Sequence, residues 1–209
     1  MSKERKENKI IIMKKTYLFI DGTNLYAGQY ELFGPKAYLN FSKLIQTIEK
    51  NFSISFTKIF FYASYTPKTE KISKKINLSL KNESLFYKNV KLTKNLTFFT
   101  GYRSKTSGKE KEVDVKLTAD LVYESLTNKN VDVYLFSGDA DFIQALIKVK
   151  SVNKNPVVIS LQNRIMYKAV YFFKLIIISF DSLWKEKFKR LYGYKELRML
   201  KRDVIIPMK

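Results

Sequence analysis

Short apolar runs alternate along the chain with longer segments of helical periodicity. The apolar runs are nearly continuous and are soon followed by Gly, Pro, Asp or Ser, which predicts buried strands over residues 17–20, 59–62, 96–100, 131–136, 156–160 and 175–179. Apolar residues at every third or fourth position predict helices over 41–48, 69–90, 113–127 and 140–150, and a short one over 163–171. Strands of this kind that alternate with helices favour a parallel sheet covered on both faces.

These elements predict one Rossmann-like α/β domain. The chain of 209 residues suits a single domain with appendages, and no repeat or internal linker divides it. We expect the domain over residues 16–181, a basic extension over 1–15 before it, and a basic, partly helical tail over 182–209 after it. The most apolar run, Leu175–Phe180, is far shorter than the roughly 20 residues that a membrane helix needs, so no membrane span is expected.

The composition narrows the chemistry, because the chain contains no Cys and no His. Disulfides, thiol nucleophiles, Cys/His zinc sites and histidine general bases are therefore excluded. Any reaction must use carboxylates, hydroxyls, lysine or a hard metal ion bound through oxygen. The lack of cysteine is typical of a protein of the reducing cytoplasm, and we expect a cytoplasmic location.

The net charge of +20 arises from 39 Lys and Arg against 19 Asp and Glu. A surface this basic attracts polyanions, of which nucleic acid is the first candidate. A second explanation is also open, because most of the cations are lysines in a chain rich in Ile, Asn, Phe and Tyr. The base composition of a genome produces that bias without selection for binding.

Acidic residues follow two of the predicted strands where a ligand would bind. Asp21 and Asn24 follow the first strand, and Asp139 and Asp141 follow the strand over 131–136. Ligands of open α/β sheets lie outside the carboxyl ends of the strands. If these two strands are neighbours, three acids and an amide meet at one edge of the sheet.

The helix predicted over 113–127 adds further acids. Asp114 lies in its first turn, which in a strand–helix–strand unit is close to the same edge of the sheet. Asp120 is roughly 9 Å further along the helix axis, so it either supports the site from behind or pairs with Lys116.

A cluster of Asp21, Asp114, Asp139 and Asp141 would repel itself and would have to take up protons or bind a cation. With oxygen ligands alone, Mg²⁺ or Mn²⁺ is the natural occupant. Such an ion polarises a phosphodiester and produces hydroxide from water without a histidine. Simpler roles stay open for each acid alone, as a turn residue, a helix cap or a partner of a helix dipole.

Three blocks of sequence together resemble the signature of the NYN domain, a branch of the PIN-like ribonuclease superfamily. The blocks are FIDGTNL at residues 19–25, KEVDVKLTAD at 111–120 and LFSGDADF at 135–142. The resemblance implies a PIN-like Rossmannoid sandwich with a central, mostly parallel β-sheet flanked by helices. It also implies metal-dependent cleavage of RNA, with Mg²⁺ or Mn²⁺ held by the four aspartates.

The resemblance further implies that Asn24 orients a ligand water or a phosphate. The sequence departs from the family at Glu112, where a Gly is common. Glu112 either adds an acid beside Asp114 or pairs with Lys116 at i+4. The hydroxyls of Thr23 and Ser137 either touch the scissile phosphate or serve as turn and cap residues.

The RNA would be approached by cations near the acids. We expect RNA-binding roles for five of them: Arg103, Lys105, Lys109, Arg164 and Lys168. In the tail, cations are interleaved with aromatic residues such as Trp184 and Tyr194, as single-stranded RNA stacking requires. The alternative is that these aromatic residues pack the tail onto the domain.

The first hypothesis is therefore a metal-dependent endoribonuclease, a hydrolase of RNA phosphodiester bonds. The alternative is a non-catalytic RNA-binding module of the same fold. A haloacid-dehalogenase-type phosphotransferase is disfavoured because position 23 is Thr where that mechanism needs a second Asp. A dinucleotide-binding protein is disfavoured because no Gly-rich turn follows the first strand. The sequence leaves open the RNA target and whether the chain forms a homodimer.

Overall fold

A single twisted sheet forms the centre of the molecule. The computed structural model describes residues 14–66, 73–103, 110–152, 154–180 and 193–208. The sheet is built from β1 (Lys15–Asp21), β3 (Lys58–Ser64), β4 (Leu96–Arg103), β5 (Glu110–Lys111), β6 (Val131–Phe136), β7 (Val157–Leu161), β8 (Lys174–Ser179) and β9 (Tyr194–Arg198). Its order is β5-β4-β3-β1-β6-β7-β8-β9. Every neighbouring pair is parallel except β4 and the short β5, which confirms the predicted α/β fold.

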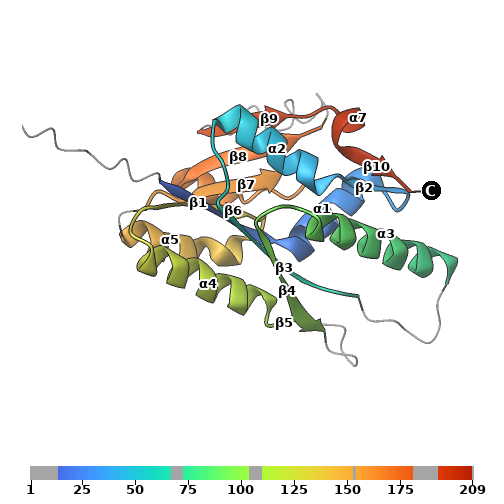
Figure 1. The fold of residues 1–209 in the computed structure, drawn as a ribbon, viewed down its shortest axis with the longest axis horizontal. Helices are drawn as coiled ribbons and strands as arrows, with labels where there is room; N and C mark the ends of the chain where they lie inside the picture. Colours follow the sequence, from blue (N-terminus) through green and yellow to red (C-terminus); the bar gives the residue numbers. More distant parts are fainter. Residues whose placement is uncertain (1–13, 67–72, 104–109, 153, 181–192, 209) are drawn as a thin grey trace, which may run out of the picture.

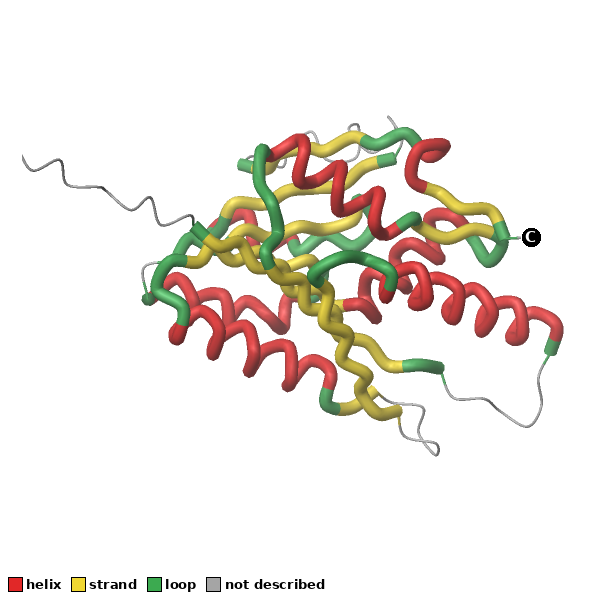
Figure 2. Tube along the Cα trace, in the orientation of Figure 1, coloured by secondary structure: helices red, strands yellow, loops and turns green. Residues whose placement is uncertain are grey.

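Helices cover both faces of this sheet (Figures 1 and 2). They are α1 (Gly22–Phe33), α2 (Phe41–Phe52), α3 (Lys74–Lys91), α4 (Val113–Thr127), α5 (Ile143–Ser151), the short α7 (Lys201–Val204) and two 3₁₀ helices, η1 (Ala140–Phe142) and η2 (Tyr167–Tyr171). Helices α1, α2 and α3 pack on one face, and α4 and α5 pack on the other. A second, two-stranded sheet pairs β2 (Ala37–Leu39) with β10 (Ile205–Pro207).

The alternation of side chains along β1 divides the core into two layers. Leu18 and Ile20 belong to the layer under α1, α2 and α3. Tyr17 and Phe19 belong to the layer under α4 and α5. All four side chains are buried because successive residues of a strand point to opposite faces, and both faces are covered here.

Helix α1 is the main element that the hydrophobic pattern did not predict. A turn residue and a helix cap were both open as roles for Asp21. Its carboxylate accepts a hydrogen bond from the backbone N–H of Asn24, so Asp21 is the cap with which a helix begins. Other helices also differ from their predicted bounds. Helix α2, predicted over 41–48, extends to Phe52, and η2 covers only Tyr167–Tyr171 of the helix predicted over 163–171. The helix predicted over 69–90 begins at Lys74 within the described residues, and the one predicted over 140–150 divides into η1 and α5.

Residues 193–208, in the predicted tail, form part of the fold. Strand β9 pairs in parallel with β8, and Leu197, Met199 and Val204 are buried against the domain. Residues 182–192 of the predicted tail and residues 1–13 of the predicted extension lie outside the described residues. No helix in the described ranges is long and apolar enough to cross a membrane.

Candidate active site

Strands β1 and β6 are neighbours, so their carboxyl ends lie side by side. The register pairs Ile20 with Phe136, which brings the residues that follow each strand to one edge of the sheet. We call this place the acid edge, and its predicted members are Asp21, Asn24, Asp114, Asp139 and Asp141. The two strands are neighbours, which was the condition for three acids and an amide to lie at one edge of the sheet.

Asp21 is the most enclosed of these side chains, with 4% of its surface exposed. Its Oδ1 accepts a hydrogen bond of 2.9 Å from the backbone N–H of Asn24, and its Oδ2 accepts one of 2.9 Å from the Ser137 hydroxyl. The first bond caps α1, and the second joins the ends of β1 and β6. Asp21 is therefore held in one orientation by groups of both strands.

The turn after β6 extends this network. The Asn24 Oδ1 accepts a hydrogen bond of 3.0 Å from the Gly138 amide, and the Ser137 Oγ accepts one of 3.0 Å from the Asp139 amide. The Asp139 Oδ1 in turn accepts a bond of 2.9 Å from the Asp141 amide and caps η1. Asp21, Asn24 and Asp139 thus belong to one chain of hydrogen bonds.

Two glycines allow the elements to approach this closely. A methyl group on Gly22 would lie 2.1 Å from the ring of Phe61, and one on Gly138 would lie 2.1 Å from the carbonyl oxygen of Arg164. The second contact is with backbone, which has little room to move. The Arg164 side chain is also engaged, because its guanidinium forms an ion pair with both carboxylate oxygens of Glu31 on α1.

Asp114 and Asp141 form a more open part of the acid edge. Both side chains are exposed, and together they line a hollow of about 380 Å³ between α4 and η1. The rest of its wall is formed by Val115, Thr118, Ala119 and Phe142. Helix α4 therefore brings Asp114 towards the turn that carries Asp139 and Asp141, as its place in the first turn predicted.

Glu112 adopts a backbone conformation that favours glycine. Its φ of 74° lies in the left-handed region, and its side chain makes no capping hydrogen bond to α4. The family's common Gly at this position is explained by that conformation. Lys116, the partner that the alternative gives to Glu112, forms an ion pair of 2.6 Å with Asp120.

Asp120 anchors α4 to the sheet. Its Oδ2 accepts a hydrogen bond of 2.8 Å from the Tyr62 hydroxyl, and its Oδ1 accepts the Lys116 ammonium. Burial, followed by this hydrogen bond, raises the pKa of Tyr62 far above its ordinary value. Of the two roles predicted for Asp120, the pairing with Lys116 is present, and a role in support of the site stays a prediction.

The other predicted residues differ in their surroundings. The Ser137 hydroxyl is buried and already bonded to Asp21 and to the Asp139 amide, so its described contacts are structural. Thr23 is partly exposed in the first turn of α1. Of the predicted RNA-binding cations, Lys168 is exposed on η2, and Arg103 ends β4. Lys105 and Lys109 lie outside the described residues.

Glu83 is a buried acid that the sequence pattern did not reveal. It is 3% exposed on α3, and it accepts hydrogen bonds from the Thr66 amide at 3.0 Å and the Thr66 hydroxyl at 2.9 Å. These bonds fix the chain just after β3. Its helix is rich in Lys and Asn, so neither hydrophobic periodicity nor a motif marked this position.

The donor chemistry of the acid edge suits a hard divalent cation, since it offers carboxylate and amide oxygens and no nitrogen or sulfur ligand. Within the described ranges, however, no three acidic side chains lie close enough together to hold an ion. A carboxylate has about four lone-pair sites, and the cap that Asp139 forms uses one of them, so this side chain can still act as a ligand.

Comparison with known proteins agrees with this architecture. The model of the NYN domain matches residues 15–175. A solved structure of a protein of unknown function from Vibrio parahaemolyticus is similar in fold, with a TM-score of 0.55 and 12% identity over 81% of this chain and 94% of that chain. No curated protein sequence matches the chain.

Proposed function

Because the chain belongs to the NYN domain family, we propose that it is a metal-dependent endoribonuclease that hydrolyses RNA phosphodiester bonds at the acid edge. The observation that carries the proposal is the hydrogen-bond network between the ends of β1 and β6. It joins Asp21, Asn24 and Asp139, which match the family's acidic and amide positions. Burial of a carboxylate costs free energy, and a residue that only forms a turn does not require this burial.

In this proposal Asp21, Asp114, Asp139 and Asp141 hold Mg²⁺ or Mn²⁺. The ion, when bound, polarises the phosphodiester and makes its bound water more acidic. Asp21 supplies a fixed carboxylate because its two oxygens are oriented by Asn24 and Ser137. Asn24 keeps the turn after β6 in place through the Gly138 amide.

A specific observation also favours the second candidate, an RNA-binding module without cleavage. Asp21 and Asp139 both cap helices, and the described part of the chain contains no group of three acids in metal-binding proximity. Caps of this kind stabilise a helix by about 1 kcal/mol without any ligand. RNA is the binding partner in both proposals, so cleavage is the property that separates them.

The test is cleavage of a labelled single-stranded RNA by the pure protein with Mn²⁺ or with EDTA. Asp139→Asn should lower cleavage by about 100-fold or more, because it removes a charged ligand. Its side chain still accepts the Asp141 amide, so η1 keeps its cap. Asp203→Asn is the matched control, since Asp203 is an exposed aspartate of α7 that is not a member of the acid edge.

The two candidates give different outcomes. Metal-dependent cleavage that is lost in Asp139→Asn and retained in Asp203→Asn supports the nuclease. Equal RNA binding by all three proteins, without cleavage by any, supports the module. In the absence of metal, the melting temperature of Asp139→Asn should be unchanged or higher, because repulsion between acids is relieved. A fall of several degrees would contradict a clustered acid site.

A further inference from the structure

Helix η2 is attached directly to the acid edge. The Ser160 hydroxyl donates a hydrogen bond of 2.8 Å to the Ser137 carbonyl, and it accepts one of 3.4 Å from the Met166 amide. The carbonyl of Arg164 lies against Gly138, and η1 and η2 are in contact. The segment that enters η2 is therefore fixed to the turn that carries Asp139 and Asp141.

The outer surface of η2 exposes large aromatic side chains beside cations. Tyr171 is 79% exposed, Tyr167 is 48% exposed and Phe172, which follows the helix, is 47% exposed. Lys168 is exposed as well. Residues three apart in a 3₁₀ helix lie on the same face, so Lys168 and Tyr171 are stacked one turn apart. An aromatic ring and an ammonium group are thus presented together.

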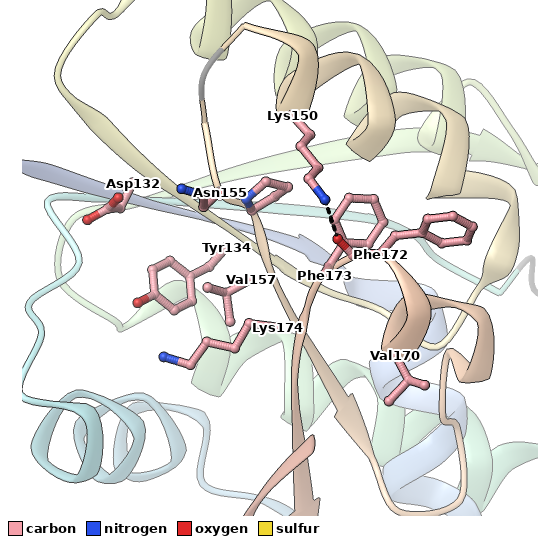
Figure 3. Close-up of a pocket in the computed structure, with 10 residues that line it drawn as sticks. Asp132, Tyr134, Lys150, Asn155, Val157, Val170, Phe172, Phe173 and Lys174 are labelled. Carbon is pink, nitrogen blue, oxygen red and sulfur yellow. Dashed lines mark hydrogen bonds between the residues drawn. The ribbon is translucent and has the colours of Figure 1, made fainter. Parts of the chain in front are cut away.

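The backbone beneath these rings is anchored. Ala169 and Phe173 are buried in the layer of the core under α4 and α5. The Lys150 ammonium on α5 donates a hydrogen bond of 2.9 Å to the Phe172 carbonyl, as the dashed line in Figure 3 shows. The exposed rings therefore stand on a fixed support, which lowers the entropy lost when a ligand stacks on them.

Beyond η2 the surface continues into a hollow of about 460 Å³ (Figure 3). Phe172 lines it, together with Lys174 at the start of β8 and Tyr134 of β6. In Figure 3 the Lys174 ammonium and the Tyr134 hydroxyl point to the same side. The acid that also lines it, Asp132, forms an ion pair of 2.6 Å with Lys14, so its charge is balanced.

We infer that η2 is a stacking platform for the single-stranded RNA that flanks the cleavage position, an inference that rests on the proposed ribonuclease function. Unpaired bases stack on Tyr171 and Phe172, and the phosphates between them contact Lys168 and Lys174. Successive aromatic rings flanked by lysines suit a polyanion that carries flat bases. The strand passes from the acid edge over η2 towards the hollow at the opposite edge of the sheet.

The test measures RNA binding in EDTA, where a metal-dependent enzyme cannot cut. A fluorescein-labelled oligouridine of 12 nucleotides is titrated with wild type, Tyr171→Ala and Tyr171→Phe. We expect Tyr171→Ala to bind about fivefold more weakly or worse, and Tyr171→Phe to bind within about twofold of wild type. Tyr123→Ala is the matched control, because Tyr123 is a tyrosine of α4 that is 64% exposed.

Two further measurements identify the ligand. Affinity for a blunt duplex RNA should be the same for wild type and Tyr171→Ala, because paired bases offer no faces for stacking. Lys168→Ala should lower the dependence of log affinity on log salt by about 0.7, the value for one phosphate contact on a single strand. Lys88→Ala, at an exposed lysine of α3, should leave it unchanged.

The outcomes separate the platform from the proposed function. A wild type that cuts RNA with Mn²⁺, but binds no better than Tyr171→Ala, overturns the platform alone. Equal losses in Tyr171→Ala and Tyr123→Ala also overturn it, as does a change of oligomeric state in Tyr171→Ala, which would make a second copy the occupant. A wild type that neither binds nor cuts RNA overturns both proposals.

Discussion

The acid edge has two halves that are built in different ways. The inner half, formed by Asp21, Asn24, Ser137 and Asp139, is joined by hydrogen bonds between the ends of β1 and β6. The outer half, formed by Asp114 and Asp141, consists of exposed side chains around an open hollow. The fold therefore fixes one half in advance. The other half places two exposed carboxylates beside solvent, at the rim of that hollow.

We expect the largest effect on stability from Gly138→Ala, which tests how tightly the inner half is packed. The added methyl group would meet the Arg164 carbonyl at 2.1 Å, and backbone has to shift to admit it. We expect a loss of about 3 kcal/mol in the free energy of unfolding, measured by urea denaturation. Gly22→Ala is the comparison, because its methyl group meets the Phe61 side chain instead, and Phe61→Leu in a double variant should recover part of the loss.

A direct comparison of the halves is given by Asp21→Ala and Asp114→Ala. Asp21→Ala removes a helix cap and leaves the buried Ser137 hydroxyl without its acceptor, so we expect a loss of about 2 kcal/mol. Asp114→Ala changes an exposed residue in the first turn of α4, and its stability should stay within about 0.5 kcal/mol of wild type. Equal losses in chemical denaturation would show that the halves are not distinct.

The fold and the inner half are predictable from sequence to different degrees. The strand over 131–136 and the helix over 113–127 have the predicted bounds, because an apolar run and a helical period are local signals. The sequence left open whether β1 and β6 are neighbours, because strand order depends on packing between distant segments. Strand β9 was missed because its residues are mostly polar and only Leu197 is buried, and β10 was missed because it has only three residues.

Sequence analysis identifies the residues of the site more readily than the contacts between them. The motifs contain Ser137 and Gly138, but only the packing shows that one bonds to Asp21 and the other makes room for Arg164. Arg164 was predicted to bind RNA, and its ion pair with Glu31 depends on how α1 lies beside the loop after β7. Local periodicity carries no information on such pairs.

Alkaline pH tests how α4, which carries Asp114 of the outer half, is attached to the sheet. The raised pKa of Tyr62 means that the folded state favours the neutral phenol more than the unfolded state, whose pKa is about 10. The stability from Tyr62 is complete below pH 10 and is lost as the pH rises above it. We expect wild type to lose up to about 1.4 kcal/mol per pH unit more than Tyr62→Phe between pH 10 and 11.

Asp120→Asn is the control for this measurement. It removes the charge that opposes ionisation of Tyr62 but keeps the ring buried, and burial is the larger cause of the raised pKa. Its stability should therefore fall with pH at a rate between those of wild type and Tyr62→Phe. Identical slopes for wild type and Tyr62→Phe would mean that this contact does not hold α4 to β3.

The smallest expected effect belongs to Glu112→Gly, at the start of the outer half. Glu112 has a φ of 74° and no capping hydrogen bond, so glycine relieves backbone strain without removing a cap. The gain is partly offset by the greater freedom of glycine in the unfolded chain, and we expect a net increase of about 0.5 kcal/mol in unfolding free energy. RNA cleavage with Mn²⁺ should change little if Glu112 only precedes Asp114 in the chain. A large fall in cleavage together with unchanged or higher stability would instead make Glu112 a working acid of the outer half.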